Sequence, residues 1–270
     1  MKTAERIVRV PEGAIETMAA PRTGVSHWLR SFRLMMRFDA GRAREWAGMM
    51  VIVQVFMGAG MAITYGFFYP VVTTTIALYI VTGTPTLALI PLGLVMVPLG
   101  VSQQKVEGTF DFIWSLPAPR SAQAASTFVL WTALSIPGMV VAVAIAAWKY
   151  GVTLSVSPAI VPAVLLSALM AISIGFGMAL AIQSPIIVNL ITNTLVFVVL
   201  LFSPIVFPAS HLPPWLMDVH RVLPFYAMAQ VVRAGLTTGI VSDVAHWYVV
   251  LIVWTAIGWG LTAWVVGRRR

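Results

Sequence analysis

The sequence predicts an all-α integral membrane protein with six transmembrane helices, an N-terminal amphipathic interfacial helix and a re-entrant outer helical hairpin before the last span. Hydrophobic residues fill 59% of the 270 positions, charged residues fill only 10%, and the mean hydropathy is +0.91. Because soluble domains carry about 25% charged residues, this composition excludes soluble enzymes and disordered chains. The chain has no cysteine, which excludes disulfides, zinc–thiolate sites and thiol catalysis.

Six apolar stretches are long enough to cross a hydrocarbon core about 30 Å thick. They cover 47–69, 83–102, 123–147, 159–182, 186–206 and 247–266. Pro70, Gly83 and Pro85 are typical helix breakers, so we assign 70–82 to an outer loop. Pro91 and Pro98 are expected to kink the second span.

Basic residues predict the orientation of these spans. Of the 17 Lys and Arg residues, 14 fall in segments that lie on the cytoplasmic side if the N-terminus is cytoplasmic. Basic residues near spans stay on that side, so we expect both termini of this multi-pass protein in the cytoplasm. The net charge of +8 therefore indicates membrane topology and lipid contact, and we expect no nucleic-acid partner.

Three segments follow: a flexible cytoplasmic N-terminus over 1–23, an amphipathic helix over 24–45 and the six-helix membrane domain over 46–270. In the amphipathic segment, apolar side chains recur at steps of three and four residues and so share one helical face, and basic side chains lie on another face. This pattern favours an interfacial helix, and the alternative is a short soluble helix packed on the cytoplasmic side. The residues concerned are Trp28, Arg30, Phe32, Arg33 and Arg37.

The spans lack groups that carry chemistry. No Asp, Glu, Lys, Arg or His lies inside any predicted span, which argues against an ion-coupled carrier. No catalytic motif and no phosphate-binding G-x-x-x-x-G-K-[ST] occurs. We therefore expect no catalytic residue, no metal site and no cofactor in this chain. His211, Asp218 and His220 could be read as metal ligands, but their spacing matches no ligand pattern.

The loop after the second span, 103–120, contains a short amphipathic helix. Phe110, Ile113 and Trp114 share one helical face, and prolines follow at 117 and 119. This face either docks in a groove of a partner subunit or dips into the membrane interface.

Two motifs give this sequence a family resemblance. The run Glu107-Gly108-Thr109, followed by Leu116-Pro117 and Arg120, resembles the E-x-G-T … P-x-x-R region after the second helix of ABC-2 type permeases. Residues 203–236 are similar to that family's Pro-rich outer segment. The resemblance covers about 25–270. It departs from the family pattern at 103–105 and in the unusually apolar loop between spans 1 and 2.

The resemblance implies a bacterial ABC exporter subunit in the cell inner membrane. Its expected partners are two cytoplasmic ATPase subunits, which bind ATP and Mg²⁺, and a second permease chain, either an identical copy or a paralogue. The substrate would be an amphiphilic or hydrophobic drug, lipid or lipid-linked glycan. Residues that would couple to the ATPase are Glu107, Gly108, Thr109, Phe110, Ile113, Trp114 and Arg120.

The outer segment after span 5 is apolar although the charge rule places it outside. Pro213 or Pro214 can start a helix, Pro224 interrupts it, and a second helix would end near Gly235 or Gly239. In the resembled family such a re-entrant hairpin closes the pathway from outside. The outer-gate candidates are Pro204, Pro208, Pro213, Trp215, Pro224 and Arg233.

Span 5 carries two amides on one helical stripe with Phe197 and Leu200: Asn189 and Asn193. Amides in a membrane need partners, so the stripe faces either a substrate pathway or another helix. The resemblance implies that spans 2 and 5 meet across a dimer. A functional alternative to the exporter is a membrane scaffold or assembly protein that recruits a cytoplasmic partner through 107–120.

Overall fold

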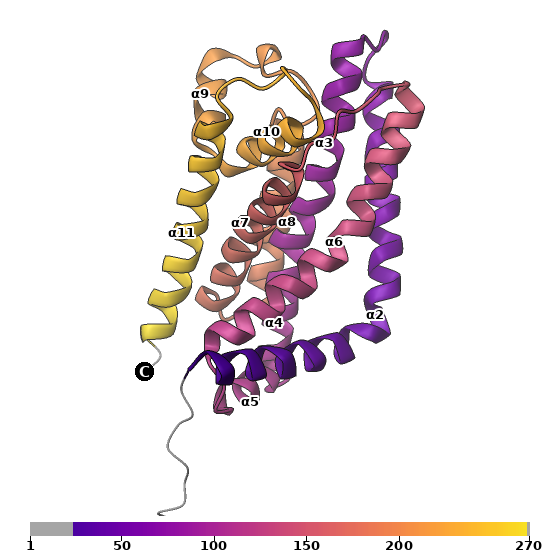
Figure 1. The fold of residues 1–270 in the computed structure, drawn as a ribbon. Helices are drawn as coiled ribbons and strands as arrows, with labels where there is room; N and C mark the ends of the chain where they lie inside the picture. The colour runs from indigo at the N-terminus through magenta and orange to yellow at the C-terminus, as the bar shows by residue number, and fades with distance from the viewer. Residues whose placement is uncertain (1–23, 269–270) are drawn as a thin grey trace, which may run out of the picture.

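The computed structural model describes residues 24–268, and every regular element in this part of the chain is a helix. Figure 1 shows long helices running side by side, with short α5 at one end of the bundle and short α9 and α10 at the other. We call these the α5 end and the hairpin end. Six stretches are long and apolar enough to cross a membrane, which confirms the predicted all-α membrane fold. They are α2 (Val25–Phe67), α3 to α4 (Thr74–Val106), α6 (Arg120–Tyr150), α7 (Ile160–Ala181), α8 (Pro185–Phe202) and α11 (Val244–Arg268).

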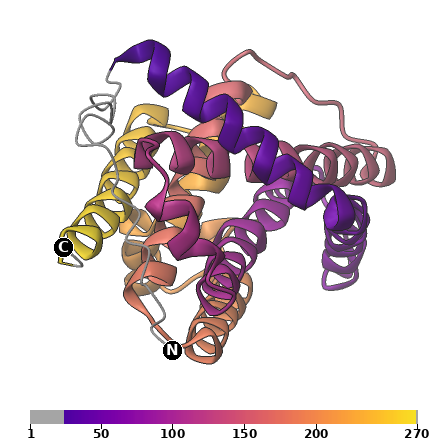
Figure 2. The ribbon, with the colours of Figure 1, turned by 90° about the horizontal axis from the view of Figure 1, so that it is seen from below.

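Helix α2 joins the predicted amphipathic segment to the predicted first span without a break. Its N-terminal part lies across the α5 end of the bundle, and the rest runs along the bundle beside α6 (Figures 1 and 2). In the crossing part, Ser31 and Met35 are buried against the bundle, whereas Leu29, Leu34 and Phe38 are exposed. This part is therefore packed on the protein and also presents apolar side chains to its surroundings.

The second span begins earlier than predicted. Residues 74–82 form the first turns of α3 (Thr74–Pro91), so the prediction of an outer loop is wrong for them. Thr73 caps this helix, and Pro85 lies inside it. Neighbouring helices enclose α3, and threonine hydroxyls donate to backbone carbonyls one turn earlier. These contacts explain why a proline that would break an isolated helix is tolerated.

A π-helical turn over Leu92–Met96 joins α3 to α4 (Val97–Val106). The N–H of Val97 donates to the carbonyl of Leu92, and Pro98, which has no N–H, follows directly. The irregular turn thus lies between Pro91 and Pro98, the two prolines predicted to kink this span.

Span 2 lies at the centre of the bundle because glycines permit backbone contact there. A Cβ on Gly175 of α7 would collide with the carbonyl oxygen of Gly93, and one on Gly83 with the carbonyl oxygen of Ile205. Side chains along α3 are buried almost without exception from Ile80 onward. Span 2 packs against α8 within the same chain and leaves little surface for a second chain.

The hairpin end contains the two predicted helices. α9 spans Pro214–Val222 and α10 spans Pro224–Leu236. Pro214 starts the first helix as predicted, and Pro224, predicted to interrupt that helix, is the first residue of the second. A single 3-10 turn, Ala209–His211, precedes them. α10 is buried along nearly its whole length and packs against α3, α7 and α11.

Candidate functional site

The turn between α4 and α5 depends on one glycine. α4 ends at Val106, and α5 covers Thr109–Ser115. Gly108 adopts a left-handed conformation with φ of 73°, which strains any other residue. The carbonyl of Gly108 then accepts from the N–H of Phe112 at 3.1 Å, which starts α5. The conformation of this turn explains why glycine stands between Glu107 and Thr109.

The aromatic face of α5 points into the protein. Phe110 is 2% exposed and Ile113 5% exposed, and both pack in the interior. The rings of Phe110 and Trp114 lie 4.7 Å apart, and the guanidinium of Arg120 lies 4.5 Å from the centre of the Trp114 ring. The interior contacts of this face fix α5 on the end of the bundle.

The opposite face of α5 is exposed. It consists of Asp111, Phe112, Ser115 and Leu116, which we call the outer face of α5. Phe112 is 59% exposed, and Val106 beside the turn is 66% exposed. A large aromatic side chain at the end of a membrane bundle is a natural contact for another protein or for the membrane interface.

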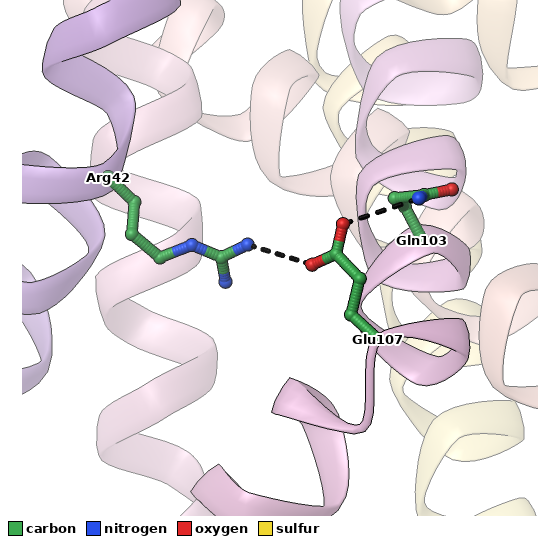
Figure 3. A network of polar contacts seen from close by, with 3 residues as sticks. All are labelled: Arg42, Gln103 and Glu107. Atoms are coloured by element: carbon green, nitrogen blue, oxygen red, sulfur yellow. Dashed lines mark hydrogen bonds and ion pairs between the residues drawn. The ribbon is translucent and has the colours of Figure 1, made fainter.

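Glu107 links the turn to α2. Its carboxylate oxygens lie 3.4 Å from Nη2 of Arg42 and 3.3 Å from Nε2 of Gln103, as Figure 3 shows. Both charged side chains are well exposed, 39% for Arg42 and 42% for Glu107. An exposed pair of this kind contributes about 0–1 kcal/mol. The main effect of this ion pair is therefore to orient the Arg42 guanidinium toward Glu107.

A cavity of about 420 Å³ lies beside this ion pair. α2, α4 and α6 form most of its wall, and α5 and α7 contribute one phenylalanine each. The side chains at the wall are mainly apolar and aromatic, with three glutamines and two charged groups among them. They include Asp39, Arg42, Trp46, Met50, Met96, Gln103, Gln104, Phe110, Gln123, Trp131 and Phe176.

Arg233 of α10 is fully buried near the hairpin end. It donates from Nη2 to the carbonyl of Ile205 at 2.6 Å, from Nε to the hydroxyl of Thr82 at 3.0 Å and from Nη1 to Gln230 at 2.8 Å. Its guanidinium also lies 4.2 Å from the centre of the Tyr79 ring. One side chain thus ties α10 to α3 and to the segment after α8. We call these five residues the Arg233 cluster.

Comparison with known families assigns this architecture. The model of the ABC-2 type transporter family matches residues 31–237, which is well over half of the chain. The protein belongs to the ABC-2 type transporter family. Chains of this family are permease subunits of ABC transporters and work with an ABC ATPase subunit. No curated protein matches this permease significantly.

The structure changes the prediction for the loop of this permease. Phe110 and Ile113 are buried, so the prediction that their face receives a partner is wrong for these side chains. Glu107, predicted as an ATPase-coupling residue, forms an ion pair with Arg42 of the same chain. Thr109 is half-buried at the start of α5, and Arg120 begins α6. The outer face of α5, by contrast, is exposed.

The amide stripe of the permease lies along α8 without an enclosing wall. Asn189 and Phe197 are exposed, whereas Asn193 and Leu200 are half-buried. Asn193 donates from Nδ2 to the carbonyl of Asn189 at 2.8 Å and also contacts its side-chain oxygen. Exposed amides in an apolar helix are costly against lipid, so this face needs a cover of protein or water.

The outer-gate candidates separate into buried and exposed residues. Pro204 and Pro224 are buried with Arg233, Pro208 is half-buried, and Pro213 and Trp215 are exposed. Among the described residues, no three His, Cys, Asp or Glu side chains gather as a metal site. Asp218 pairs instead with Arg221 at 3.1 Å. Burial lowers the pKa of His220 below its usual value, which favours the neutral ring.

The candidates on the first helix face two ways. Trp28 stacks on Phe32 with 5.5 Å between ring centres and donates from Nε1 to Ser121 of α6 at 2.9 Å. Arg30, Arg33 and Arg37 are exposed. The apolar side chains therefore attach this helix to the bundle. The three arginines lie outside that contact. The predicted segment 1–23 lies outside the described residues.

Sequence reasoning missed three residues that matter here. Phe112 lies on the face of α5 opposite the predicted docking face. The helical pattern alone does not say which of the two faces packs against the rest of the protein. Asp39, on the wall of the cavity, lies in the amphipathic segment 24–45, whose pattern does not distinguish it from the other polar residues there. Thr82, a partner of Arg233, falls in the segment 70–82, for which the sequence predicts a loop. Only long-range contacts identify these residues.

Proposed function

We propose that this chain is the permease of an ABC exporter that moves an amphiphilic or hydrophobic substrate out of the cytoplasm or the inner leaflet. The observation that carries the proposal is the exposed outer face of α5, held between spans 2 and 3 of an ABC-2 membrane domain. The ATPase subunit docks on this face, binds ATP with Mg²⁺ and supplies the energy. The mostly apolar walls of the bundle support a hydrophobic substrate.

The complete transporter contains two permease chains and two ATPase subunits. α8 supports the pairing, because it presents the Asn189 amide together with exposed Ile186, Leu190 and Phe197 on a helix that is mostly uncovered. A second permease chain on α8 covers these amides and leaves Asn189 and Asn193 at the edge of the substrate pathway. Either a second copy or a paralogue satisfies this arrangement.

The proposal sets the α5 end in the cytoplasm of a bacterial cell, with the permease in the inner membrane. The N-terminal end of α2 and the C-terminal end of α11 both lie at the α5 end (Figure 1). We expect a single cysteine at Ser210, an exposed residue of the hairpin end, to react with an impermeant maleimide on intact cells. The chain has no native cysteine that would interfere.

A cysteine at Ser115, exposed on α5, is the matched control and should react only after the cells are permeabilised. Labelling of Ser115 but not Ser210 on intact cells contradicts the proposed orientation.

Docking is tested by replacing Phe112 with alanine. Aromatic anchors at interfaces often cost about 2 kcal/mol or more when truncated, which is about a 30-fold loss of affinity. We therefore expect the Phe112→Ala permease to insert normally but to lose most of the copurifying ATPase and of ATP-driven transport. Glu107→Gln should have a much smaller effect, because the Arg42–Glu107 pair is exposed.

Trp148→Ala is the matched control, since Trp148 is 85% exposed at the opposite end of α6. Parental ATPase recovery with Phe112→Ala would mean that the outer face of α5 touches the membrane interface instead. Recovery of a partner without ATPase activity would favour the scaffold alternative.

A further inference from the structure

The cavity at the α5 end has the size and lining of a site for a small organic molecule. Its volume of about 420 Å³ falls within the range of about 300–1,000 Å³ that is typical of drug-sized ligands. It lies within one chain, between α2, α4 and α6, and so exists without a second permease. Its half-buried lining residues Trp46 and Met50 adjoin Met49, which is 72% exposed on α2. The cavity therefore adjoins an exposed apolar part of α2.

Aromatic rings form a large part of the wall. Trp46 of α2 and Trp131 of α6 lie 5.3 Å apart with an interplanar angle of 32°, and Phe110 and Phe176 complete the aromatic lining. The faces of such rings carry negative electrostatic potential and attract cations, with tryptophan the most effective. The wall thus offers both apolar contact and cation–π attraction.

Asp39 is the one carboxylate among the residues that line the cavity. Asp39 and Arg42 are the charged side chains at the wall. Glu107 draws the Arg42 guanidinium toward the turn (Figure 3), and Lys105 is held by the backbone carbonyls of Ala179, Leu180 and Ile182. Two carboxylates, Asp39 and Glu107, therefore share the Arg42 guanidinium, and the ammonium of Lys105 lies 6.0 Å from the centre of the Phe110 ring.

Asp39 itself is half-buried and accepts a hydrogen bond from the hydroxyl of Ser126 at 2.6 Å. No ion pair of Asp39 occurs within the described part of the chain. Burying a carboxylate is unfavourable unless a cation compensates its charge, so a bound cation beside Asp39 would lower the cost of its partial burial.

We propose that this cavity binds a lipophilic organic cation, with the positive centre between Asp39 and the Trp46–Trp131 pair and the apolar groups against Met50 and Phe176. The inference rests on the proposed transport function and names its substrate class. It also gives the ion pair of Glu107 with Arg42 a second role. Because Glu107 holds Arg42, movement of the α4–α5 turn would change how much of the Arg42 charge faces the cavity.

The test measures binding of tetraphenylphosphonium to the purified permease without the ATPase, by equilibrium dialysis. We expect Asp39→Asn, which keeps the size and the hydrogen bond from Ser126, to weaken binding about tenfold. Arg42→Gln should strengthen binding about threefold, because it removes the opposing charge and leaves Glu107 unpaired. A folding defect cannot raise affinity, so the opposite signs separate charge from misfolding.

Arg44→Gln and Glu45→Gln are the matched controls, since both residues are exposed on α2 and lie off the cavity wall. Both should bind the cation like the parent, and neutral triphenylphosphine oxide should bind all variants equally. Parental affinity of Asp39→Asn, or a loss of affinity with Arg42→Gln, would overturn the proposal. So would an absence of binding to the parent.

Reconstitution with the ATPase separates this inference from the proposed function. Charge-dependent binding without ATP-driven flux would retain the cation site and refute export. ATP-driven flux of other substrates, with no binding of tetraphenylphosphonium, would retain export and refute the cation site.

Discussion

Replacing Arg233 with alanine is expected to lower the free energy of unfolding of the permease by about 2–5 kcal/mol. The substitution removes the donor to three buried acceptors, the carbonyl of Ile205, the side-chain oxygen of Gln230 and the hydroxyl oxygen of Thr82. Each buried polar group left without a hydrogen bond costs about 1–3 kcal/mol. The loss of stacking on Tyr79 adds to this cost. Thermal unfolding of the detergent-purified protein measures the effect.

Arg221 provides the matched control on the same hairpin. Its ion pair with Asp218 is exposed, with 59% and 70% of the side-chain surfaces accessible. Such pairs contribute about 0–1 kcal/mol, so Arg221→Ala should unfold within a few degrees of the parent. Equal melting temperatures for Arg233→Ala and Arg221→Ala would show that the Arg233 cluster does not hold the hairpin end together.

Arg233→Lys refines this prediction. Lysine keeps the charge, but its ammonium is a compact point and cannot reach Thr82, Gln230 and Ile205 together as the planar guanidinium does. We expect a stability between those of the parent and the alanine variant. The hairpin end then depends on the shape of the arginine and not only on its charge.

The sequence predicts the bundle well because lipid imposes one simple requirement on it. Long apolar runs must be helical in a membrane, and six such runs are confirmed. The starts of α9 and α10 are also predicted, because proline at the first helical position is a local signal. Residues 74–82 are mispredicted because Pro85 is a breaker only when no neighbours support the helix. Those neighbours come from distant parts of the chain.

The face of α5 could not be predicted for a related reason. The spacing of Phe110, Ile113 and Trp114 correctly identifies an apolar face, and α5 is a helix. A period of three and four residues fixes which side chains share a face, but not what covers that face. The covering surface here comes from the bundle itself. Arg233 shows the same limit, since its partners lie 151 and 28 residues away in the sequence.

Phe110→Ala should destabilise the permease by about 3–5 kcal/mol, the usual cost of truncating a buried phenylalanine. Phe110 is 2% exposed, packs on Trp114 at 4.7 Å and lines the cavity. Truncation removes its contacts and enlarges an existing space, which the surrounding helices can only partly fill. The free energy of unfolding in detergent is the measurement.

Phe112→Ala allows the stabilities of two phenylalanine variants on the same short helix to be compared. Phe112→Ala should change the free energy of unfolding by less than about 0.5 kcal/mol, as exposed substitutions usually do, while it lowers ATPase affinity. Phe110→Ala should instead lose stability, and any ATPase that it loses should return in proportion to the folded fraction at lower temperature. A Phe110→Ala protein with parental stability and no ATPase would contradict the inward orientation of α5. The two aromatic residues, two positions apart, therefore distinguish a face that holds the helix on the bundle from a face that meets the partner.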